Sequence, residues 1–149
     1  MSRPHASGAI EVRIASLSRD IYSGACRSVV APGVQGEMCI LPRHAPLMTR
    51  LAPGEVRLAP AEGEELFFYV SGGLMETEGQ TVTILADEML RSDEIDADVA
   101  REIRRNAELM LKKSPLFSER DKAHAALIQA LAQLRVIEHE LAARHIKRR

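Results

Sequence analysis

The sequence predicts a β + α protein of two domains, with an N-terminal antiparallel β-sandwich followed by a C-terminal antiparallel two-helix hairpin. Between residues 10 and 91, short apolar runs alternate with turns that contain glycine or proline. All nine glycines lie before residue 92, and beyond it apolar residues recur every three or four positions, which is helical spacing. Ser114-Pro115 interrupts this second part and divides it into two helices. We therefore expect an N-terminal extension over 1–9, a sandwich over 10–91 and a hairpin over 92–149.

The first strand is expected at residues 10–14, where apolar and polar residues alternate as in a strand with one buried face. Glu78-Gly79-Gln80 is predicted as a tight hairpin, because glycine readily takes the positive φ that such a connection requires. Turn signals at regular spacing favour an antiparallel sandwich or barrel. Six further strands are expected at 26–30, 38–41, 55–58, 66–70, 74–77 and 81–85.

The first helix is predicted from a stripe of apolar residues and covers about four turns. Acidic residues precede it and Lys112 and Lys113 end it, as the helix dipole favours. Ser118, with Asp121 three positions later, is predicted to cap the second helix. The two stripes consist of Val99, Ile103, Ala107 and Met110, and of Leu127, Leu131, Leu134, Ile137 and Leu141.

The second helix is rich in alanine, so it buries little apolar area per residue. The pair must therefore pack on each other, on the sandwich or on a partner, and movement between these arrangements is physically plausible. The basic excess of the chain lies here, with seven basic and four acidic residues in 118–149.

The composition excludes several classes of function. The formal net charge is −1 and aromatic residues make up 3%, which argues against a nucleic-acid binder. The two cysteines indicate a reducing compartment. Neither a signal peptide nor a membrane-spanning stretch is expected, so the sequence predicts a soluble, cytoplasmic protein.

No motif indicates catalysis. His139 and His145 are six residues apart, whereas a zinc-protease helix places its histidines four apart. Apart from His5 in the N-terminal extension, His44 is the β half's histidine, too few for a metal centre, and we expect no metal and no cofactor. The ordinary interpretation of His44 is a hydrogen-bonded turn residue.

Several short motifs in a fixed order resemble the epsilon subunit of bacterial rotary ATP synthases, from about Ile10 to Leu141. They are Gly36-Glu37-Met38, Leu41-Pro42-Arg43-His44-Ala45-Pro46-Leu47, Pro53-Gly54, Ser71-Gly72-Gly73-Leu74, Val82-Thr83-Ile84-Leu85-Ala86-Asp87 and Ala132-Gln133-Leu134-Arg135-Val136-Ile137-Glu138.

The resemblance implies a sandwich of about ten strands and a non-catalytic rotor subunit bound to the gamma subunit and the c-ring. It would couple ion translocation to ATP synthesis at the cytoplasmic face of the bacterial inner membrane, as a peripheral part of the synthase. Its hairpin would fold against the sandwich or extend along gamma toward the alpha and beta subunits, where it would inhibit ATP hydrolysis.

By position, the resemblance implies that Val34, Gln35 and Glu37 face the c-ring and that His44 contacts gamma or the c-ring. The cations facing an acidic segment of the beta subunit would be Arg135, Arg144, Lys147, Arg148 and Arg149.

The sequence departs from the family pattern at two informative positions. Arg43 replaces the glycine usual before His-Ala-Pro, so either the backbone there does not need positive φ or the turn is altered. Ile95 and Asp96 keep the frame of a nucleotide-binding motif, but Val99 replaces its arginine, which argues against tight ATP binding.

A second hypothesis comes from another class of protein. The chain could be a stand-alone β-sandwich that binds a small ligand, with the helices as a lid. This hypothesis predicts a monomer whose stability depends on ligand and which has no gamma partner.

Overall fold

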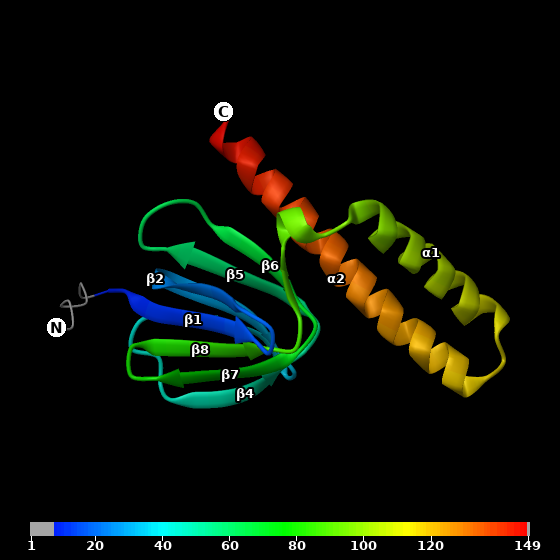
Figure 1. Cartoon of the computed structure of the whole chain (residues 1–149), viewed down its shortest axis with the longest axis horizontal. Coiled ribbons are helices and arrows are strands. Elements are labelled where there is room, and N and C mark those ends of the chain that lie inside the picture. The colour runs from blue at the N-terminus through cyan, green and yellow to red at the C-terminus, as the bar shows by residue number, and fades with distance from the viewer. Residues whose placement is uncertain (1–7, 149) are drawn as a thin grey trace.

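The computed structural model describes residues 8–148 and confirms the predicted fold class, a β-sandwich followed by a helical hairpin (Figure 1). Among these residues the β domain has nine strands, close to the ten that the resemblance implies. They are β1 (Ile10–Ser16), β2 (Asp20–Gly33), β3 (Gly36–Ile40), β4 (Leu47–Leu51), β5 (Gly54–Pro60), β6 (Leu66–Val70), β7 (Gly73–Glu78), β8 (Thr81–Ala86) and β9 (Met89–Arg91). A short 3₁₀ helix, η1 (Ser92–Glu94), leads into α1 (Ala97–Lys113) and α2 (Phe117–Lys147).

Strand β2 belongs to both layers of the sandwich. Its first half pairs antiparallel with β1, placing Cys26 opposite Ile10, and its second half pairs with β5, placing Val30 opposite Arg57. The ladder shifts between Cys26 and Ser28, and such an irregularity bends a strand. The strand order is β1-β8-β7-β4-β2-β5-β6-β9, with β3 paired to β2 and with β1 and β8 parallel.

The core lies between the two layers and is filled by alternate residues of the strands. Val12, Val29, Val56, Phe68 and Ile84 are fully buried there. Removing each such side chain from water contributes roughly 1.5–3 kcal/mol to folding. The helices are outside this core.

The strand predictions are confirmed in position, but three details differ. The Gly79 turn is present with a φ of 60°, joining Glu78 and Thr81 as expected. Strands β4 and β9 were not predicted, since β4 is a short segment near two prolines and β9 has 3 residues. Strand β2 is 14 residues long rather than five, because the glycine within it, Gly24, does not end the strand.

The α1–α2 contact is made by smaller residues than the sequence predicts. The large members of the predicted stripe, Val99, Ile103 and Met110, are 48%, 40% and 42% exposed. Ala100, Ala107, Ala123 and Ala130 are the buried helix residues of this part of the hairpin, and α1 packs on α2. Alanine at seven-residue spacing lets two helices approach closely, which leaves the longer side chains at the sides of the contact.

The predicted cap of α2 is wrong. The helix begins at Phe117 with Leu116 as its N-cap residue, and within the described chain no side chain caps it. Ser114 organises the turn instead: its hydroxyl oxygen accepts a hydrogen bond from the amide of Leu116 at 3.3 Å and bonds to Glu119. Proline at 115 favours an extended residue before it, which separates the helices.

Candidate functional site: contact surfaces of the sandwich and the hairpin

The β2–β3 turn presents the three residues expected to face the c-ring. Gly33 pairs with Gly36, so Val34 and Gln35 form a two-residue connection, and the amide of Val34 donates to the carbonyl of Arg50 at 3.0 Å. Val34, Gln35 and Glu37 are all exposed. Gly36 has a φ of 136°, a conformation that favours glycine. The turn is therefore held by backbone bonds while its side chains remain accessible.

His44 lies in the loop between β3 and β4. Its Nδ1 is 2.7 Å from the carbonyl oxygen of Ala45, and its amide donates to the carbonyl of Leu41 at 3.2 Å. The buried Thr77 hydroxyl also donates to Ala45, at 3.0 Å. His44 is thus a hydrogen-bonded turn residue that is still exposed.

Arg43 adopts the left-handed backbone conformation, with a φ of 68°. The first alternative, that this backbone does not need positive φ, is therefore wrong. The loop keeps the conformation that glycine favours, and an arginine bears the associated strain, of order 1–2 kcal/mol.

The turn around Val34 and the His44 loop lie at opposite ends of β3. Glu37 is near the first end, Ile40 is the last residue of the strand, and His44 lies beyond it. Five residues of extended chain span about 16 Å. The residues expected to face the c-ring and the residue expected to contact gamma or the c-ring are therefore separated by the length of a strand.

The outer face of β4, β7 and β8 carries an apolar row that sequence reasoning missed. Arg50 pairs with Leu74, and Leu74 pairs with Leu85. Leu74 and Leu85 are 45% and 56% exposed, and Met48 on the same face of β4 is also exposed. The alternation of residues in 73–78 could have predicted that Leu74 faces outward. Which residues lie beside it could be known only from the order of the strands in the sheet. Exposed apolar rows of this kind are typical of protein contacts.

The later part of α2 packs on the other outer face of the sandwich, at β5 and β6, while α1 projects away from the strands (Figure 1). Phe67 and Tyr69 from β6, Ile95 from the linker and Val136 from α2 form a second buried cluster. Burial raises the pKa of the Tyr69 hydroxyl, which lies beside Gln133. The hairpin is thus docked through one small apolar cluster.

Polar contacts border this cluster. Nδ1 of His139 lies 2.8 and 2.9 Å from the two carboxylate oxygens of Glu55, whose side chain is nearly buried. Arg57 lies 4.0 Å from the same carboxylate. Glu55 therefore has a partner on the sandwich and another on the hairpin.

The predicted inhibitory cations do not form one surface. Arg144 pairs with Glu140 on its own helix at 2.5 Å, and Lys147 pairs with Glu64 of the sandwich at 3.2 Å. Arg135 is exposed nine residues before Arg144, which places it about 180° around the helix. Arg148 is exposed at the helix end, and Arg149 lies outside the described residues.

Ile95 and Asp96, the remnant of the nucleotide motif, both have structural roles. Ile95 is buried in the docking cluster. An Oδ1 of Asp96 accepts hydrogen bonds from the amides of Asp98 and Val99, each 3.1 Å, and so caps α1. Val99 is exposed on the first turn.

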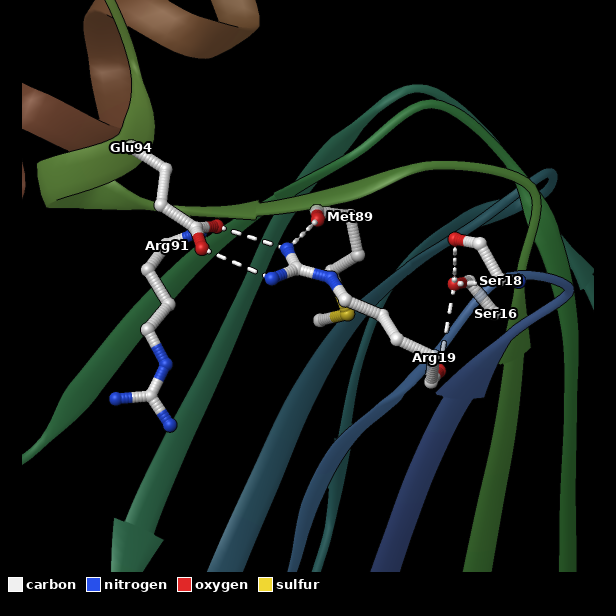
Figure 2. A network of polar contacts seen from close by, with 6 residues as sticks. All are labelled: Ser16, Ser18, Arg19, Met89, Arg91 and Glu94. Atoms are coloured by element: carbon white, nitrogen blue, oxygen red, sulfur yellow. Dashed lines mark hydrogen bonds and ion pairs between the residues drawn. The ribbon is translucent and has the colours of Figure 1, made fainter.

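A polar network fixes the linker to the sandwich, and sequence reasoning missed it (Figure 2). Arg19 donates from both terminal nitrogens to the two carboxylate oxygens of Glu94, and also to the carbonyl of Met89 at 3.2 Å. The same carboxylate accepts from the amide of Arg91 at 2.9 Å. The hydrogen bonds from Arg19 are the main cause that lowers the pKa of Glu94 to about 2. No local sequence signal pairs residues 75 apart.

Residues 8–148 contain neither a metal-binding cluster nor a membrane-spanning helix. No group of three or more His, Cys, Asp or Glu side chains there could hold a metal ion. No helix in this range is long and apolar enough to cross a membrane.

Comparisons with known proteins agree with this architecture. The family described as "ATP synthase, Delta/Epsilon chain, beta-sandwich domain" matches residues 9–92. The ATP synthase epsilon chain of Halorhodospira halophila is 43% identical over 130 residues, covering 87% of this chain and 92% of that protein. The epsilon chain of Nitrosococcus oceani is 45% identical over 129 residues, with the same coverage of 87% and 92%.

Solved structures share the fold at lower identity. A chain in the cryo-EM structure of the Euglena gracilis mitochondrial ATP synthase (OSCP/F1/c-ring) has a TM-score of 0.78 and 20% identity, covering 94% of this chain and 86% of that chain. A chain of the Tetrahymena thermophila mitochondrial ATP synthase, from its central stalk and c-ring, has a TM-score of 0.61 and 13% identity, covering 86% of this chain and 96% of that chain.

Proposed function

This chain belongs to the family of ATP synthase epsilon chains, and from that premise we propose that it is a non-catalytic subunit of the central-stalk rotor. The proposal assigns residues 10–91 to attachment and residues 92–149 to regulation. The main support for this division is that the sandwich has its own core and that the hairpin adjoins it through one small apolar cluster. The chain would act at the cytoplasmic face of a bacterial inner membrane, as a peripheral part of the synthase that couples ion translocation to ATP synthesis.

The sandwich would attach through two separate sites. The β2–β3 turn, with Val34, Gln35 and Glu37, suits the polar loops of a c-ring, because its side chains project from a backbone-bonded connection. The His44 loop lies beyond the far end of β3, so we assign it to gamma. The apolar row of Leu74 and Leu85 would extend the gamma contact.

The hairpin would regulate ATP hydrolysis by leaving the sandwich. Its docked form is held by one apolar cluster, in which Val136 is the buried residue of α2, and by the polar pairs His139–Glu55 and Lys147–Glu64. A contact of this size can open without unfolding the sandwich, so the docked form can exchange with an undocked form. Undocked, α2 would present Arg135, Arg144, Lys147, Arg148 and Arg149 to the alpha and beta subunits. An acidic segment of beta would then offset the cost of undocking.

The test is ATP hydrolysis by a catalytic complex depleted of this subunit and reconstituted with defined variants. The full chain should bind and inhibit. A chain ending at Ile95, which keeps Glu94 and its bonds to Arg19, should bind without inhibiting. If both forms bind and neither inhibits, the regulatory part of the proposal is wrong. If neither binds, the proposed place in the rotor is wrong.

A reversible lock keeps the whole chain present in the same assay. Glu55→Cys with His139→Cys, in a Cys39→Ser background, places two thiols across the docked contact. A short cleavable bis-maleimide across them should abolish inhibition, and cleaving it should restore inhibition. Modification with N-ethylmaleimide is the control. Inhibition that survives the cross-link would show that the hairpin need not undock.

A further inference from the structure

The loop between β5 and β6 places carboxylates against the basic end of α2. Glu62, Glu64 and Glu65 are exposed in this acidic loop, residues 61–65. Oε1 of Glu64 lies 3.2 Å from Nζ of Lys147. Glu65 and Arg144 line the same cavity of about 220 Å³ between the loop and the helix.

The basic residues at the end of α2 differ in where their acidic partners lie. Arg144 is paired with Glu140 of its own helix, at 2.5 Å. Lys147 pairs with a carboxylate of the sandwich, that of Glu64, and Arg148 is exposed at the end of the helix. The acidic loop therefore supplies a negative charge that the last turn of α2 does not supply itself.

We propose that the acidic loop is an internal competitor for the basic end of α2. It would bind the same cations that the proposed function directs to an acidic surface of the catalytic subunits, and would thereby hold the inhibitory element in its docked form. The target of those cations rests on the proposed function, whereas the docking contact rests on the structure alone. A single ammonium group cannot bind both carboxylate surfaces at once, so the two interactions exclude each other.

The size of the effect follows from the exposure of the pair. The side chains of Lys147 and Glu64 are 54% and 72% exposed. Exposed ion pairs change an equilibrium roughly 1.5- to 5-fold each, and salt screens them. The loop therefore shifts the fraction of docked molecules by a small factor. A partner can overcome a preference of this size, as the proposed competition requires.

Hydrogen exchange on the isolated full chain tests the docking contact. Glu64→Gln with Glu65→Gln should raise the exchange rate of amides in residues 136–147 about 1.5- to 5-fold, and 0.5 M NaCl should reduce the difference. Asp20→Asn with Glu78→Gln removes the same charge from exposed sites on other strands and is the matched control. Unchanged exchange in the loop variant would overturn the proposal.

Charge reversal tests the competition itself. Glu64→Lys with Lys147→Glu preserves an opposite-charge pair inside the chain but reverses one cation toward the partner. Its exchange rates should match those of the parent chain, while half-maximal inhibition of the reconstituted complex should need several-fold more protein. Glu64→Gln with Glu65→Gln should inhibit at several-fold lower concentration.

The two proposals fail in different ways. If the parent chain does not inhibit at all, the proposed function is wrong and the competition falls with it, while the exchange data still report the docking contact. If the parent chain inhibits but neither variant changes the concentration required, the competition is overturned and the proposed function stands.

Discussion

The guanidinium of Arg19 binds the carboxylate of Glu94 through two hydrogen bonds of 3.0 Å each, joining the end of the β1–β2 connection to η1 (Figure 2). Because Glu94 also accepts from the amide of Arg91, the linker is bonded to the sandwich up to that residue. Only Ile95 and Asp96 separate it from α1. A hairpin that undocks would therefore turn about these two residues.

The first prediction concerns the titration of Glu94. Its pKa in the folded protein is about 2, below the ordinary value of 4.5, mainly because Arg19 donates to it. A lowered pKa stabilises the folded state above pH 4.5, and this contribution is lost as the pH falls from 4.5 to 2. Arg19→Ala should raise the pKa of Glu94 toward 4.5 in a carboxyl ¹³C NMR titration. Arg27→Ala, at an exposed site within β2, should leave it near 2.

The second prediction concerns the strained backbone at Arg43. Arg43→Gly should stabilise the protein by up to about 1 kcal/mol, because glycine takes a φ of 68° without the penalty of a side chain. Urea unfolding measures the change as a higher midpoint. Arg27→Gly should lower the midpoint, since glycine weakens a strand interior. A loss of stability in Arg43→Gly would mean that the arginine makes compensating contacts.

The third prediction separates the docking cluster from the core. Val136→Ala removes a fully buried side chain from the contact between α2 and β6, at a cost of roughly 2 kcal/mol. Amides of α2 should then exchange faster while those of the sandwich core keep their rates. Val56→Ala should instead accelerate exchange throughout the sandwich, because Val56 lies in the main core. Equal acceleration everywhere in both variants would mean that the domains unfold together.

The fourth prediction concerns the alanine contact between the helices. Ala107→Leu should destabilise the hairpin by about 1–3 kcal/mol, because a larger side chain forces the closely packed helices apart. Val99→Leu, on an exposed position of α1, should change stability by less than about 0.5 kcal/mol. Thermal melting followed by circular dichroism at 222 nm measures both.

The fifth prediction concerns the apolar row. Leu74→Asp with Leu85→Asp should leave the fold intact, because both side chains are about half exposed. It should weaken binding to a purified gamma subunit at least tenfold if the row is part of that contact. Ala61→Asp, at an exposed position of the β5–β6 loop in the other layer, is the control. If the double variant binds gamma as tightly as the parent chain, gamma must bind to another face of the sandwich.

The sequence predicted the features that arise from local periodicity. Alternation placed β1, and a glycine at the required position predicted the turn at Gly79. The α1 helix was recognisable from its charged ends and its spacing. Such features depend on neighbours in the chain, which a single sequence displays directly.

Features that depend on distant pairing were not predictable. The apolar stripe through Ile103 predicted the helix but not which of its residues pack on α2. The buried residues of α1 are alanines, whereas Ile103 is exposed. Nothing near Arg19 indicates Glu94, since the two meet only when β2 and η1 come together. The family motifs named Val34 and His44 as contact residues, but only the structure shows that the whole of β3 lies between them.

The parallel pairing of β1 with β8 bears on how the chain assembles during synthesis. Glu11 lies opposite Thr81, 70 positions later, so the edge of β1 has no β8 partner until most of the sandwich has left the ribosome. At about 5–20 residues per second, this interval is several seconds. Meanwhile β1 can pair with β2, which follows it directly. This hairpin covers one edge of β1, whereas the edge that will meet β8 stays unpaired and open to other chains until the late strand closes the sheet.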